Sequence, residues 1–113
     1  MLPKAMVAAS TKPLLLSILG KGESYGYLIV KKVRALSGGR LIWSFGMLYA
    51  VLHRLERDGL VRSAWRTSEE GRLRKYYRLT PRGQRELEKE KEAWQRVNEV
   101  LLKVWAPAGG ERP

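Results

Sequence analysis

Apolar residues recur with helical spacing in the middle of the chain, between residues 44 and 59. Four of them occupy positions i, i+3, i+4 and i+7 of one face: Leu48, Val51, Leu52 and Leu55. This spacing predicts an amphipathic helix that buries one side. Ser44 is a favourable N-cap residue, and Gly59 is a favourable residue just past a C-terminus, so both ends of the helix are marked.

The opposite face of this predicted helix is basic and aromatic. It carries Ala50, His53 and Arg57, and it is flanked by Tyr49 and Arg54. Acidic residues are scarce there, because Glu56 lies nearer the apolar stripe and Asp58 stands at the helix end. Such a face suits insertion into a DNA groove, with Ser44 at the helix start as a further contact. An ordinary solvated helix face is the alternative.

A dense apolar block over residues 14–19 indicates a first helix. Pro13 precedes this block, and a proline within a helix lacks an amide donor and clashes with the carbonyl group four residues back. The sequence therefore leaves two alternatives. The helix begins at about Pro13, or a longer helix from about Lys4 is kinked there.

A second helix is predicted from about Tyr25 to Leu36, with Ser24 as its cap. Its apolar stripe consists of Ile29, Val33 and Leu36. Residues 41–43 are too few for a helix and are a candidate for a small strand. The second helix and the basic helix that follows it are joined by a short link, which is a helix-turn-helix pattern.

The spacing changes to that of strands after Gly59. Residues 60–66 and 74–80 are rich in β-branched and aromatic side chains, and residues 67–73 favour a turn, so a β-hairpin is predicted. Its tip carries three basic residues, Arg72, Arg74 and Lys75. A basic hairpin directly after a basic helix is typical of a wing that reaches DNA phosphates or a minor groove. An ordinary solubilised hairpin tip is the alternative.

A long helix is predicted from Pro81 to about Val104, because Thr80 is a good N-cap and proline is favoured at the first helical position. Its apolar residues follow heptad spacing, interrupted once by Glu90: Leu87, Trp94, Val97, Leu101 and Val104. About 24 helical residues span roughly 36 Å, which is more than a domain of this size can cover. The stripe therefore predicts a homodimer interface, to which the first helix also contributes.

The charge of the chain is concentrated on the candidate DNA-reading elements. The 113 residues include 22 lysines and arginines against 11 aspartates and glutamates, a net charge of +11. Residues 31–80 alone hold twelve basic and four acidic residues. A polyanion such as nucleic acid is the natural partner of one basic domain of this kind.

Other classes of protein are not expected. The sequence has no cysteine, no signal-peptide pattern and no apolar run near the roughly 20 residues of a membrane helix, so we predict a cytoplasmic protein without a membrane partner. It has one histidine, and His53 has no predicted acidic neighbour. We therefore predict no catalytic residue, no metal site and no cofactor, and we interpret His53 as a groove contact or a solvated residue.

Several stretches, taken in order, are similar to the PadR family of bacterial transcriptional regulators. They are Tyr25-Gly26-Tyr27, Gly46-Met47-Leu48-Tyr49, Leu52-His53-Arg54-Leu55-Glu56, Gly59-Leu60-Val61 and Arg74-Lys75-Tyr76-Tyr77-Arg78-Leu79-Thr80-Pro81-Arg82-Gly83. The resemblance covers about residues 12–105, and the single long helix at the end resembles the small subfamily. Met47 and Ala50 stand where the family commonly has threonine and proline.

The resemblance and the predicted elements together indicate an α+β fold, mainly α with a β-hairpin. A winged helix-turn-helix DNA-binding domain (residues 1–80) would be followed by a C-terminal dimerisation helix (residues 81–105) and a disordered tail (residues 106–113). The family implies a dimer that usually represses transcription and releases DNA when it binds a small molecule. A two-fold dimer should prefer a palindromic operator in double-stranded DNA.

Two other functional classes are compatible with the sequence. One is a winged-helix module that binds a protein through its hairpin. The other is a DNA-coating protein that binds by charge, without sequence preference.

Trp94 is the candidate for ligand binding. Tryptophan at a heptad position is most simply an interface residue. In a symmetric dimer, however, two Trp94 rings near the dyad would leave a flat apolar slot for a planar aromatic molecule. The stretch Trp94-Gln95-Arg96-Val97 resembles the one that forms such a slot in some small PadR-like regulators. The predicted ligand set is Glu90, Trp94, Val97 and Asn98.

Overall fold

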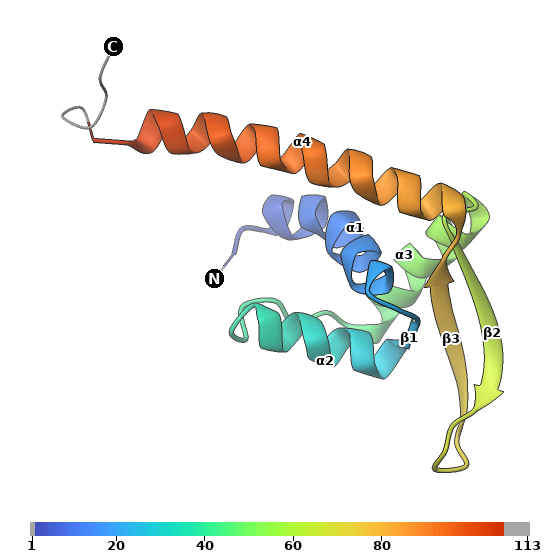
Figure 1. Cartoon of the computed structure of the whole chain (residues 1–113). Coiled ribbons are helices and arrows are strands. Elements are labelled where there is room, and N and C mark those ends of the chain that lie inside the picture. The colour runs from blue at the N-terminus through green and yellow to red at the C-terminus, as the bar shows by residue number, and fades with distance from the viewer. Residues whose placement is uncertain (1, 108–113) are drawn as a thin grey trace.

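The computed structural model describes residues 2–107, which form four helices and a three-stranded sheet. In chain order the elements are α1 (Lys4–Gly20), β1 (Ser24–Tyr25), α2 (Gly26–Leu36), α3 (Phe45–Arg57), β2 (Val61–Thr67), β3 (Leu73–Leu79) and α4 (Pro81–Trp105). The first three helices pack together, the β2–β3 hairpin stands out from them, and α4 runs along α1 and then past it (Figure 1). Most of the predicted tail, residues 108–113, lies outside the described residues.

α1 is one helix from Lys4 to Gly20 that runs through Pro13, so the alternative in which the helix begins at about Pro13 is wrong. The proline removes one amide donor from the helix. Tertiary packing compensates for that loss, because most helical stability in proteins comes from burial of an apolar face. The residues of α1 buried in the core include Leu15, Leu16, Ile18 and Leu19.

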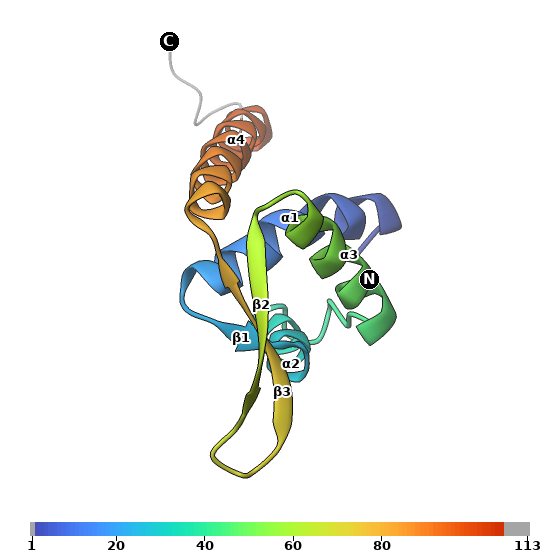
Figure 2. The same cartoon turned by 90° about the vertical axis from the view of Figure 1, so that its right-hand side faces the viewer.

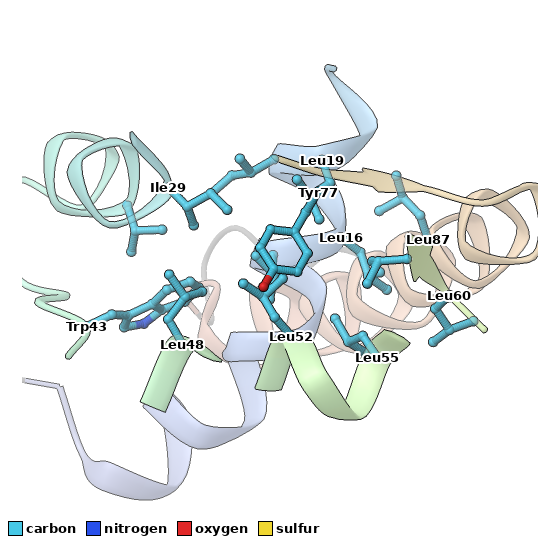
Figure 3. Packing of buried hydrophobic residues seen from close by; sticks show 14 of the residues in the cluster. Leu16, Leu19, Ile29, Trp43, Leu48, Leu52, Leu55, Leu60, Tyr77 and Leu87 are labelled. Carbon is cyan, nitrogen blue, oxygen red and sulfur yellow. The ribbon is translucent and has the colours of Figure 1, made fainter. Parts of the chain in front are cut away.

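The three-helix cluster and the sheet share one hydrophobic core (Figure 3). Its fully buried members come from α1, α2, α3 and the sheet, and include Leu15, Leu16, Ile29, Leu48, Leu52 and Tyr77. The apolar stripe predicted for α3 is confirmed, since Leu48, Leu52 and Leu55 are buried and Val51 packs against them. The core therefore fixes which face of α3 points outward.

Three predictions around α2 are wrong. Ser24 does not cap α2, because it lies buried in β1 and pairs with Tyr77 of β3; the N-cap residue is Tyr25. Residues 41–43 alternate buried, exposed and buried, but they join none of the described strands and so form no strand themselves. Leu36, expected on the apolar stripe, is 76% exposed at the helix end.

The predicted β-hairpin is confirmed, with boundaries shifted by one residue. β2 and β3 pair antiparallel from Val61↔Leu79 to Thr67↔Leu73, and β1 joins the other side of β3, so the strand order is β1-β3-β2. The tip of the β2–β3 hairpin points away from the helices (Figure 2). We call this hairpin, residues 61–79, the wing.

α4 is fixed at its start to the elements that precede it. The Thr80 hydroxyl accepts a hydrogen bond from the Gly83 amide at 3.0 Å, which confirms the predicted cap, and donates one to the Gly59 carbonyl oxygen at 2.6 Å. Gly83 is buried so close to Leu60 that a Cβ atom there would overlap the Leu60 carbonyl oxygen. The end of α3, the start of the wing and the start of α4 therefore form one joint.

Only the first part of α4 belongs to this core. Leu87, predicted for the dimer interface, is 3% exposed within a single chain and packs in the chain's own core, so that assignment is wrong. The reason is that α4 passes from the core into solvent between Leu87 and Trp94. An ion pair of 2.7 Å between Lys12 and Glu86 also joins α4 to α1, and it holds the pKa of the Glu86 carboxyl below its ordinary value.

Candidate nucleic-acid interface

α3 is held at both ends by local hydrogen bonds, as its sequence predicts. The Ser44 hydroxyl accepts a hydrogen bond from the Met47 amide at 3.1 Å. At the other end Gly59 has a φ of 77°, and the amides of Gly59 and Leu60 donate to carbonyl oxygens of the last turns at 3.0 and 2.9 Å. This is a Schellman motif, which requires a residue that tolerates the left-handed conformation.

The face of α3 opposite the core is open to solvent. The residues predicted to contact DNA are all exposed on it: Tyr49, His53, Arg54 and Arg57. Ser44 is exposed as well, but its hydroxyl is engaged by the Met47 amide, so its observed role is to cap the helix. Within residues 2–107 all four side chains keep exposed surface, so a partner can approach them from solvent.

Tyr49 is held in place by two neighbours. Its ring stacks on Phe45 with centroids 6.4 Å apart. Its hydroxyl lies against Gly26 at the start of α2, where a Cβ atom would overlap it. Gly26 is thus a positioning residue that sequence reasoning missed, although a glycine at the first position of a helix was a signal that could have found it.

The three basic residues near the wing tip have different surroundings. Arg72 is exposed. The Arg74 guanidinium lies over the Tyr25 ring, 4.2 Å from its centroid, and 3.8 Å from the Glu70 carboxylate. The Lys75 ammonium lies 6.0 Å from the centroid of the Trp65 ring. Two of the three cations are therefore held against aromatic rings, an arrangement that the sequence did not indicate.

A cleft of about 730 Å³ separates α3 from the wing. It is lined by Tyr25, Gly26, Tyr27, Tyr49, His53, Trp65, Arg72, Leu73, Arg74, Lys75 and Tyr77. The cleft brings together five of the predicted DNA-contacting residues, whereas Ser44, Arg54 and Arg57 lie outside it on the surface of α3. None of the described residues that line it is acidic, so its electrostatic potential favours an anionic partner.

Tyr77 forms part of the floor of this cleft, and its hydroxyl points toward α3 (Figure 3). A tyrosine hydroxyl is neutral at physiological pH even at its ordinary pKa, and burial raises the pKa of Tyr77 further, to about 12. The floor of the cleft therefore adds no negative charge.

The wing is braced from its other face by Arg66, which sequence reasoning also missed. The Arg66 guanidinium donates two hydrogen bonds to the Glu23 carboxylate, at 2.6 and 2.9 Å, and lies 4.1 Å from the centroid of the Tyr76 ring. These bonds hold the pKa of the Glu23 carboxyl below its ordinary value. The contact joins β2 to the segment before β1, across the central strand.

A model of the "Transcriptional regulator PadR-like family" matches residues 15–89. The chain belongs to this family. The PadR-like transcriptional regulator of Bacillus cereus has a similar structure, with a TM-score of 0.83 at 26% identity over 92% of this chain and 99% of that one. A PadR family transcription regulator of Clostridium difficile gives a TM-score of 0.75 at 33% identity, over 86% of this chain and 99% of that one.

A further relative is transcriptional regulator Rv3488 of Mycobacterium tuberculosis, 42% identical over 57 residues, which are 50% of this chain and 52% of that protein. This PadR-like chain is therefore a transcriptional regulator of a DNA-binding family, not an enzyme. The predicted α+β winged helix-turn-helix fold with a long C-terminal helix is confirmed.

The outer part of α4 in this PadR-like regulator exposes a row of large apolar side chains. They are Trp94, Val97, Val100, Leu101, Leu102, Val104 and Trp105, each at least 39% exposed. Trp94 also lines a groove of about 320 Å³ between α4 and α1, together with the predicted ligand residue Glu90 and with Pro13 and Leu14. Val97 and Asn98, the other predicted ligand residues, are exposed but lie outside this groove.

Within residues 2–107 the structure holds no group of three or more histidine, cysteine, aspartate or glutamate side chains that could bind a metal ion. Over the same residues, no helix has the length and apolar character needed to cross a membrane.

Proposed function

We propose that this PadR-like regulator binds a palindromic operator in double-stranded DNA through α3 and the wing, and that residues 1–80 form its DNA-binding domain. The observation that carries the proposal is the cleft between α3 and the wing, with three cations and no acidic residue among its described lining. α3 would lie in the major groove, with Tyr49 and His53 near base edges. Ser44, Arg54, Arg57, Arg72, Arg74 and Lys75 would contact phosphates.

The test is selection of bound sequences from random duplex DNA, followed by affinity measurements over a series of salt concentrations. A specific regulator enriches a motif with half-sites about 10 base pairs apart, and binds it more tightly than competitor DNA. A DNA-coating protein shows salt dependence but enriches no motif. A protein-binding module shows neither, and that result would refute the DNA proposal.

The proposed assembly is a homodimer through the outer part of α4 and the adjacent part of α1. Its support is the row of exposed apolar residues on α4, together with Met6 of α1, which is 59% exposed. Contiguous apolar surface of this kind usually marks an interface. Replacing Val97 and Leu101 with aspartate would place unpaired charges in the buried contact, so light scattering should find monomers. Wild-type protein that is monomeric at micromolar concentration would refute this assembly.

We propose further that the dimer is a repressor released by a planar aromatic molecule held near Trp94. The support is the 44% exposure of Trp94 and the apolar groove beside it, with Glu90 as the nearest carboxylate. A molecule that touches both subunits could favour one spacing of the two α3 helices, but only by its difference in affinity for the two spacings. A typical coupling of about 1–3 kcal/mol would weaken operator binding roughly 5- to 150-fold.

Fluorescence quenching by planar aromatic compounds tests the ligand proposal. Trp94→Ala should lose most of the quenching and should keep its operator affinity in the presence of the compound, whereas wild type loses affinity. Light scattering must first show that the variant still dimerises, because truncation of an interface tryptophan can itself cost about 3–5 kcal/mol. A dimeric variant that binds such compounds as tightly as wild type would mean that Trp94 only packs.

A further inference from the structure

The wing carries two large apolar side chains that the chain itself does not bury. Trp65 of β2 is 63% exposed, and Leu73 at the start of β3 is 66% exposed. Hairpins that project into solvent are normally protected by charged residues, because exposed apolar strands invite association. Two large exposed apolar residues near the tip of a basic hairpin therefore indicate a contact surface.

Both residues lie on the face of the wing that borders the cleft. In the β2–β3 register Trp65 stands opposite Lys75, and Leu73 is two residues from Lys75 on the same strand, so the three share one face. The same face continues to Tyr77, which is buried in the core. Trp65 and Leu73 consequently line the cleft from the wing side, whereas Tyr49 and His53 line it from α3.

The charges of the cleft indicate which kind of partner binds between α3 and the wing. If α3 enters a major groove, the next feature along the duplex is a sugar-phosphate backbone, and the minor groove follows. The cations Arg72, Arg74 and Lys75 match the charge of that backbone, and no acidic residue lines the described cleft. A second copy of this strongly basic chain would be repelled from the same place, since the net charge is +11.

We infer that Trp65 and Leu73 pack against deoxyriboses on the minor-groove side of the DNA backbone that lies between α3 and the wing. The inference rests on the proposed function, in which α3 occupies the major groove. Deoxyriboses present apolar C–H surface that an indole ring and a leucine side chain can cover without hydrogen bonds. Such contacts depend on groove width and flexibility, so these two residues contribute shape readout rather than base readout.

Hydroxyl-radical footprinting of the selected operator tests the inference, because hydroxyl radicals attack deoxyriboses directly. Wild type should protect a patch of sugars flanking each α3 half-site. Trp65→Ala and Leu73→Ala should lose protection at that patch and keep it elsewhere, and Trp65→Phe should retain it. The matched control is Leu36→Ala, which truncates a leucine that is 76% exposed and lies outside the cleft.

Affinity measurements separate apolar contact from charge. Trp65→Ala should weaken operator binding about tenfold, as truncation of an interface aromatic commonly does. The slope of log affinity against log salt should change by much less than one, because the variant keeps every cation of the cleft, including Lys75. Lys75→Ala should instead lower that slope by about one.

Three outcomes would overturn the inference. One is a Trp65→Ala variant that protects the same sugars with wild-type affinity. Another is a variant whose oligomeric state changes in light scattering while its footprint does not, which would assign the face to contact between copies. A wild-type protein that selects no operator would refute the proposed function itself. This outcome differs from the other two because wild type fails as well as the variants.

Circular dichroism melts of each variant test whether it folds. Normal folding is expected because both side chains are exposed.

Discussion

Replacement of Thr80 by valine tests the joint between α3, the wing and α4. Valine keeps the β-branched shape of threonine but lacks the hydroxyl that accepts from the Gly83 amide at 3.0 Å and donates to the Gly59 carbonyl oxygen at 2.6 Å. Thr80→Ser is the matched variant that keeps both hydrogen bonds.

Two losses add up in the valine variant. Removal of an N-cap side chain costs about 1 kcal/mol, and a half-buried carbonyl oxygen that loses its donor costs about another 1 kcal/mol. Thr80→Val should therefore be about 2 kcal/mol less stable than Thr80→Ser. With a urea m-value of about 1.5 kcal/mol/M, the unfolding midpoint should fall by about 1.3 M.

Urea unfolding followed by circular dichroism measures this difference, at one fixed protein concentration because dimerisation adds to apparent stability. Ser44→Ala gives a useful comparison, since the exposed Ser44 hydroxyl makes a single capping bond at 3.1 Å and its loss should cost only about 1 kcal/mol. Equal midpoints for Thr80→Val and Thr80→Ser would show that the hydroxyl does not hold the joint.

Two further predictions follow from contacts around α4. Gly83→Ala should prevent normal folding or lower the urea midpoint far more than Thr80→Val, because the added methyl group overlaps the Leu60 carbonyl oxygen; a wild-type midpoint would refute the close approach. The Lys12–Glu86 ion pair lowers the folded-state pKa of Glu86, so its stabilisation is present above the ordinary carboxyl pKa and is lost as the pH falls through the folded-state pKa. Glu86→Gln should therefore unfold at lower urea than wild type at neutral pH, and the difference should shrink with acidification; a constant difference would contradict this.

Local signals in the sequence were sufficient for the helices that position the site. The spacing of Leu48, Leu52 and Leu55 predicts the buried face of α3, and the pair Thr80-Pro81 predicts the start of α4. Ser24 could not be placed in the same way, because its strand partner Tyr77 is distant in the sequence and pairing overrides a local capping preference.

The wrong assignment of Leu87 and the contacts that were missed at the site have the same cause, which is tertiary packing. Leu87 shares the heptad stripe of Trp94, but the stripe does not show where α4 leaves the core. The contact between Lys75 and the Trp65 ring depends on the register of the wing. The role of Gly26 depends on the approach of Tyr49 from another helix. Each of these features depends on contacts between segments that are distant in the sequence. The residue types that surround the cleft, in contrast, were visible in the sequence.

The salt dependence of operator binding tests most directly whether α3 and the wing form the DNA interface. The measurement is fluorescence anisotropy of the selected operator over a salt series, with wild type and the triple variant Arg57→Ala, Arg72→Ala and Lys75→Ala. A control variant removes the same charge from exposed residues outside the cleft: Lys4, Arg85 and Lys89. Each lost phosphate contact lowers the slope of log affinity against log salt by about 0.9, so the triple variant should lose about 2.7 and the control less than about one. A triple variant with the wild-type slope, or a control that loses as much, would contradict the assignment of the interface.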